Sequence, residues 1–179
     1  MYPVPRLLFQ AWRQRAAPPL GLLETHESEH LCWPWDLDIF GELNNGRALT
    51  IYDLGRIPWS ARIGLTRALR EQRWQVAVAG ASVRYRRRVR AFDRITMRTR
   101  GLGWDDRFFY VEQSMRLPSG EVASHVLIRS AATDRSGIVA PARVLAALGH
   151  HDPSPDLPPW VRAWTEAEAL RPWPPMSDP

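Results

Sequence analysis

The second half of the chain carries four stretches rich in Val, Ile, Thr and aromatic residues, the composition that favours β-strands. They cover 75–90, 94–102, 108–117 and 121–133, and shorter turn-like segments separate them. In the second stretch Ile95, Met97 and Thr99 alternate with polar residues, which indicates a strand with one wet face. At the last break, Gly120 can supply the positive φ of a hairpin turn. The pattern predicts four consecutive antiparallel strands.

The first half changes from an extended pattern to a helical one. Residues 24–35 are typical of a strand, and from Asn45 the apolar positions recur at helical spacing. Because these positions go most of the way round the helix, we expect it to be buried. Pro58 should kink or break it, and a second helical piece covers 59–70. Shorter helices are expected at 7–15, 141–148 and 160–170.

One strand, a long helix and four antiparallel strands form an α+β pattern, in which a five-stranded antiparallel sheet wraps around the helix. We expect this unit at 24–149. Residues 1–23 would be an N-terminal extension with a short helix, and 150–179 a proline-rich linker with a C-terminal helix.

Composition agrees with one domain, because 179 residues with 45% apolar side chains can fill a core. The single cysteine, Cys32, excludes an intrachain disulfide and suits a reducing cytoplasm. The apolar run Leu7–Phe9 is too short for a signal peptide or a membrane span, so we expect a cytoplasmic protein.

The chain carries a formal charge of +5 and no Lys, which suggests a GC-rich bacterial genome. A basic balance is compatible with nucleic acid, an anionic membrane surface, a phosphorylated ligand or a solvated cationic surface.

Residues 36–48, with the sequence DLDIFGELNNGRA, place acids and a pair of amides where the extended run meets the long helix. Asn44 or Asn45 can cap that helix, because an Asn side chain accepts a bond from a free backbone N–H. A helix start carries partial positive charge and can polarise a carbonyl oxygen. An acid beside it forms a plausible hydrolytic site.

At these residues the sequence resembles hot-dog-fold thioesterases, namely the 4-hydroxybenzoyl-CoA-thioesterase-like proteins and the plant acyl-ACP thioesterases. Their pattern is close to Asp-x-Asp-x-x-x-His-x-Asn-Asn-x-x-Tyr. Four of its positions match, and two differ: Glu42 stands where His is usual, and Ala48 where Tyr is usual. The matching residues are Asp36, Asp38, Asn44 and Asn45, and the likeness extends over 31–148.

The resemblance implies a hot-dog fold and an acyl-CoA or acyl-ACP thioesterase that works as a homodimer or larger homo-oligomer without a cofactor. Asp38 aligns with the acid that attacks the thioester or activates water. Glu42 could replace the missing His as a base, or be a surface acid near the helix start. Asp36, Asn44, Asn45 and Gly46 are candidates for substrate contact, although capping and turn roles would also explain them.

A run of arginines at 84–90 places Arg84, Arg86, Arg88 and Arg90 on one strand face. Arg86 and Arg88 are candidates for the phosphates of CoA, with a solvated face as the plainer interpretation. Nucleic-acid binding would favour aromatic residues on the same face, and Tyr85 lies on the other one. We expect no nucleic-acid partner, and a basic nucleic-acid-binding domain is the third hypothesis.

The second hypothesis is a hot-dog protein that binds acyl thioesters, or another apolar ligand, without turnover. No metal site is expected, because His26 and His30 in a strand would be about 13 Å apart. His125 should be a core or groove histidine.

Overall fold

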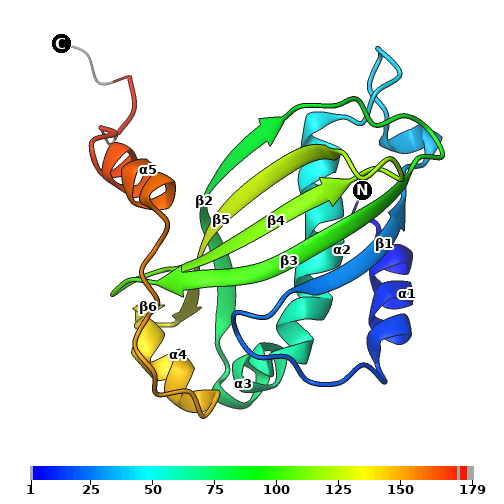
Figure 1. Ribbon diagram of the computed structural model, residues 1–179. Helices are drawn as coiled ribbons and strands as arrows, with labels where there is room; N and C mark the ends of the chain where they lie inside the picture. Colours follow the sequence, from blue (N-terminus) through cyan, green and yellow to red (C-terminus); the bar gives the residue numbers. More distant parts are fainter. Residues whose placement is uncertain (1, 173, 177–179) are drawn as a thin grey trace.

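The computed structural model describes residues 2–172 and 174–176 (Figure 1). One antiparallel sheet curls around a long helix, α2 (Asn45–Arg62). The sheet order is β1 (His26–Leu31), β3 (Arg94–Trp104), β4 (Phe109–Arg116), β5 (Val122–Asp134) and β2 (Gln75–Tyr85), and the short β6 (Gly137–Val139) also pairs with β5.

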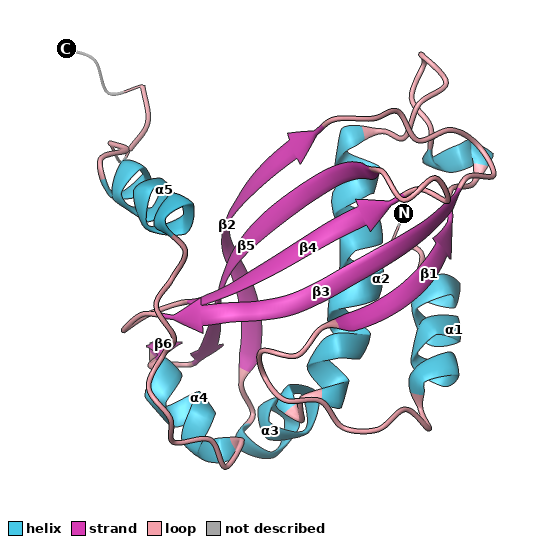
Figure 2. Ribbon diagram, in the orientation of Figure 1, coloured by secondary structure: helices cyan, strands magenta, loops and turns pink. Residues whose placement is uncertain are grey.

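The central helix is buried because apolar side chains occupy most of its circumference. Ile51, Tyr52 and Leu54 are fully buried. Gly55 allows the helix to approach the sheet, since a Cβ there would collide with the Met97 sulfur. Figure 2 shows α2 lying behind the curled sheet. The helix and the inner face of the sheet therefore share one core.

Smaller helices flank this unit: α1 (Val4–Gln14), α3 (Leu65–Gln72), α4 (Pro141–Ala147) and α5 (Pro159–Ala169). On α1, the buried Gln10 side chain donates to the backbone oxygen of Glu29 in β1. On α5, Val161 and Trp164 pack with Leu127 on the face of the sheet opposite α2. Within the part of the chain described, no helix has the length and apolar character needed to cross a membrane.

The structure confirms the α+β hot-dog arrangement, with α2 beginning at Asn45. The expected break at Pro58 is wrong, because α2 runs through this buried proline to Arg62. Burial of Leu54 and Trp59 on either side holds the helix together despite the missing N–H. The chain turns instead at Gly64, whose φ of +82° suits glycine.

Two strand boundaries also differ from the prediction. The first strand ends at Leu31 rather than at residue 35, because the chain enters a short 3₁₀ helix at Pro34–Asp36. β2 ends at Tyr85 rather than Arg90, because the N–H groups of Arg86 and Arg87 both turn to the backbone oxygen of Ala123. The division of the chain into an N-terminal extension at 1–23, a central domain at 24–149 and a C-terminal segment at 150–179 stays a prediction.

Candidate functional site

The acidic motif forms a tight hairpin directly before α2. Leu37 and Leu43 pair across it, and the Asp38 N–H donates to the Glu42 oxygen at 2.8 Å. Gly41, with φ of +74°, closes the turn. Phe40 at the tip is 78% exposed. The hairpin thus presents its acids next to an exposed apolar tip.

Asp38 is half-buried at the base of this turn. Its Oδ1 accepts the N–H groups of Phe40, at 2.9 Å, and Glu42, at 3.3 Å. Its Oδ2 has no partner among the residues that the structure describes. One oxygen therefore fixes the orientation of the carboxylate, and the other remains available to a proton or a carbonyl carbon.

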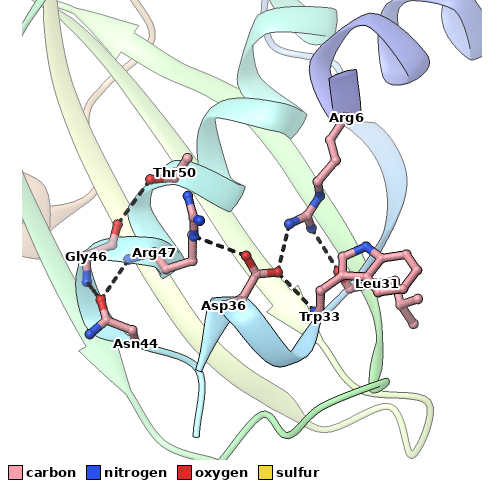
Figure 3. Close-up of polar contacts among 8 residues, drawn as sticks. All are labelled: Arg6, Leu31, Trp33, Asp36, Asn44, Gly46, Arg47 and Thr50. Atoms are coloured by element: carbon pink, nitrogen blue, oxygen red, sulfur yellow. Dashed lines mark hydrogen bonds and ion pairs between the residues drawn. The ribbon is translucent and has the colours of Figure 1, made fainter. Parts of the chain in front are cut away.

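Asn44 caps α2, as Figure 3 shows: its Oδ1 accepts from Gly46 N at 2.9 Å and Arg47 N at 3.1 Å. Asn45 occupies the first helical position and is exposed, and its backbone oxygen accepts from the Tyr85 hydroxyl at 3.2 Å. Two N–H groups of the helix start are thus already used by the cap. In residues 2–172, nothing accepts from the Asn45 N–H.

Asp36 lies inside the protein between two arginines (Figure 3). Arg6 from α1 is 2.7 Å from Oδ2, and Arg47 from α2 is 3.0 Å from Oδ1. The Trp33 N–H also donates to Oδ2, at 3.0 Å. The side chain is 0% exposed, so the geometry supports a structural role that joins α1, the 3₁₀ turn and α2. No local pattern in the sequence indicates Arg6 as a partner of Asp36, since the two residues lie 30 positions apart.

The two arginines proposed for CoA phosphates lie in different places. Arg88 pairs with Glu42, with 2.8 Å between Nε and Oε1, so its side chain contacts the hairpin that carries Asp38. Arg86 lines a cavity on the outer face of the sheet, together with His125. His125 is therefore a groove histidine, and the structure brings Arg88, but not Arg86, to Glu42.

A polar network below α2 was not predicted from the sequence. The buried Gln113 donates to the Tyr52 backbone oxygen and to Thr99 Oγ1, both at 2.9 Å. Its own oxygen accepts from Arg56 at 2.9 Å, and Arg56 pairs with Asp53. This network fixes the middle of α2 to the sheet. No three His, Cys, Asp or Glu side chains of the described residues gather closely enough to hold a metal ion.

An antiparallel sheet curled around a long helix, with an acidic turn leading into that helix, defines a hot-dog protein. Residues 32–165 match the thioesterase-like superfamily, and the chain belongs to this superfamily.

Relatives in animals carry the name Protein THEM6. The chain is 36% identical to the Xenopus laevis protein over 107 residues, which are 60% of this chain and 52% of that protein. It is 31% identical to the Danio rerio protein over 142 residues, 76% of this chain and 69% of that one. The match thus spans about half the length of the Xenopus protein. These animal relatives contradict the expectation of a bacterial source, which rested only on the arginine bias.

Solved structures show the same fold at low identity. A putative oleoyl thioesterase from Lactobacillus plantarum aligns with a TM-score of 0.65 at 18% identity, over 76% of this chain and 55% of that one. The probable thioesterase YbaW from Escherichia coli aligns with a TM-score of 0.63 at 18% identity, over 68% and 95%. At these identities the likeness shows the fold alone.

Proposed function

We propose that this protein hydrolyses acyl thioesters of coenzyme A or of acyl carrier protein, with Asp38 as the catalytic carboxylate. The observation that carries the proposal is the geometry of Asp38 in the hairpin that precedes α2. Two backbone N–H groups of the hairpin hold Oδ1, and Oδ2 has no partner among the described residues. Membership of the thioesterase-like superfamily supports the class of reaction.

In this mechanism Asp38 takes a proton from water as the water oxygen attacks the thioester carbon, or its own oxygen attacks that carbon directly. The carbonyl oxygen becomes an oxyanion, which the Asn45 N–H and the partial positive charge of the helix start stabilise. When the tetrahedral intermediate collapses, the C–S bond breaks and the leaving thiolate takes up the proton. In the direct route Asp38 takes no proton, so the thiolate leaves unprotonated. Water then hydrolyses the acyl-Asp38 anhydride: its oxygen joins the acyl carbon, and one of its protons goes to the thiolate.

We also propose a homodimer joined through β2. Among the described strands, β2 pairs only with β5, so its other edge is open. Val76 and Val78 on this strand are 48% and 52% exposed. Pairing of two β2 strands would extend the sheet and cover both residues. A dimer is the minimal assembly, and a tetramer would add a second contact.

One observation favours a second candidate function, the binding of acyl thioesters without turnover. Glu42 stands where the resembled families carry His, and its carboxylate is held by Arg88 at 2.8 Å. A carboxylate committed to an arginine is poorly placed to act as the missing base.

A panel of acyl-CoA thioesters, assayed by release of free thiol, tests the proposal. Wild type should hydrolyse at least one chain length, and Asp38→Asn should lower kcat about 100-fold or more, as loss of a general base does. Asp134→Asn is a matched control, because Asp134 Oδ1 also accepts an N–H two residues ahead, that of Ser136 at 2.8 Å.

Near-wild-type turnover by Asp38→Asn would refute the catalytic assignment. Binding of acyl-CoA by the wild type without any thiol release would support the second candidate function.

A further inference from the structure

The outer face of the sheet, opposite α2, is divided into a covered part and an open part. α5 covers one part through Val161 and Trp164, which pack with Tyr110 and Leu127. Trp160, in the first turn of α5, lies beside the open part, with its ring centroid 5.5 Å from that of His125. The open part holds a cavity of about 850 Å³, a volume typical of small-molecule sites.

The cavity wall carries arginines from β2 and from the turn that follows it, namely Arg84, Arg86 and Arg87. The strand register sets Arg84 directly opposite His125 on β5. Arg87 is already paired with Glu121, at 2.8 Å. Arg84 and Arg86 have no carboxylate partner within the described part of the chain. Two unpaired guanidinium groups on one wall repel each other, and a bound anion would relieve that repulsion.

Two acids line the cavity, Glu112 and Glu121. Glu121 is the partner of Arg87, and Glu112 is held by other groups. Arg100 Nη2 lies 2.7 Å from Glu112 Oε2, and His125 Nε2 lies 2.9 Å from Glu112 Oε1. The hydrogen bond from His125 is the main reason that the pKa of Glu112 is lowered, so the carboxylate stays ionised. An ionised carboxylate only accepts, so His125 Nε2 carries the proton and the ring is held in place.

The geometry points to a second binding site here, for an organic phosphate with a planar ring, such as a nucleoside diphosphate. Guanidinium groups bind phosphate oxygens in pairs of hydrogen bonds, which suits Arg84 and Arg86. The Trp160 indole is 44% exposed and offers a flat surface on which a planar base can stack. This site lies across the sheet from α2 and does not depend on thioester hydrolysis.

Titration calorimetry of the full chain with ADP, and separately with inorganic pyrophosphate, tests the inference. Both should bind to the wild type, and Arg84→Gln should weaken both about tenfold, as loss of one charge-assisted contact does. Trp160→Ala should weaken ADP about tenfold and leave pyrophosphate within twofold of wild type.

Two controls remove the same charge elsewhere. The first is Arg88→Gln, because Arg88 belongs to the same arginine run but contacts Glu42 of the Asp38 hairpin. The second is Arg135→Gln, because Arg135 is exposed in the turn between β5 and β6. Each should change binding less than twofold.

Equal weakening by all three Arg variants would mean diffuse attraction to a basic surface and would overturn the site. Weaker binding of both ligands by Arg88→Gln but not by Arg84→Gln would place the phosphates at the Asp38 hairpin and would also overturn the site. An absence of binding by either ligand at millimolar concentration would also refute it. An unchanged affinity of Trp160→Ala for ADP would refute the stacking of a planar ring.

Discussion

Arg47 and Asp36 form a buried ion pair that joins the first turn of α2 to the loop in front of it, with 3.0 Å between Nε and Oδ1. Arg6 approaches the same carboxylate from α1 and also donates to the Leu31 backbone oxygen at 2.8 Å. One buried carboxylate therefore bridges two guanidinium groups from distant parts of the chain. The position of the Asp38 hairpin depends on this cluster, because the backbone oxygen of Asp36 accepts the N–H of Asn44 at 2.9 Å.

Asp36→Asn should destabilise the fold by about 3–5 kcal/mol, because it removes the buried negative charge that bridges the Arg6 and Arg47 guanidinium groups. The measurement is urea unfolding at neutral pH. Glu27→Gln is the control, since the Glu27–Arg98 pair is exposed and should contribute less than about 1 kcal/mol. Equal free energies of unfolding for the two variants would show that the buried Asp36 contributes no more to stability than the exposed Glu27.

The helix start was predictable from the sequence because its signal is local. The residues of the cap, Asn44 and Gly46, lie two positions apart in the chain, and an Asn before a helical pattern is a general signature. The strands were predictable for the same reason, since their turns and alternation lie within a few residues of each other.

The rest depends on contacts that sequence patterns do not encode. Arg6 and Asp36 are in contact although they lie 30 positions apart in the sequence, and the separation of Trp160 and His125 is similar. No sequence periodicity indicates either contact. Pro58 illustrates the opposite failure. The local rule that proline breaks a helix predicted a break there, but burial of the surrounding residues keeps the helix continuous. The Asp38 site lies between these cases, because the motif was visible while the partners of Glu42 and Asp36 were not.

Two buried histidines on β1 should make stability fall with acidity. Burial lowers the pKa of His26 to about 4, with Arg62 adding to the effect, and lowers the pKa of His30 to about 3, with Arg6 adding to it. Since both pKa values lie below the unfolded value near 6.5, the unfolded chain binds more protons as the pH drops. Each histidine should cost about 1 kcal/mol of unfolding free energy between pH 7 and 5.5.

Denaturant unfolding at several pH values between 7 and 5.5 measures this loss. His30→Gln should remove roughly half of the pH dependence, since one of the two linked groups is gone. His151→Asn, at an exposed position, should leave the slope unchanged. A stability that is flat over this range in the wild type would contradict the buried, neutral state of both rings.

The dimer predicted through β2 should be broken by charge on its open edge. Light scattering should return about twice the 20.5 kDa of one chain for the wild type and about one chain mass for Val76→Lys/Val78→Lys, because lysines on an edge strand oppose pairing. Ile138→Lys places one lysine on an exposed position of β6, away from the β2 edge, and should remain dimeric. A monomeric wild type, or a dimeric double variant, would exclude this interface.

Restoring the histidine of the resembled families should distinguish the two roles of Glu42. If Asp38 carries the chemistry and Glu42 is a surface acid held by Arg88, Glu42→Gln should lower kcat less than about tenfold, well below the loss in Asp38→Asn. Glu42→His should then raise kcat, because an imidazole beside the carboxylate can donate to the developing oxyanion or orient the attacking water. Arg88→Gln serves as the control for breaking the ion pair alone, which is exposed on the arginine side and should have little effect on turnover. If Glu42→Gln is instead as inactive as Asp38→Asn, and Glu42→His recovers activity, Glu42 has taken over the histidine's role and the catalytic pair is Asp38 with Glu42.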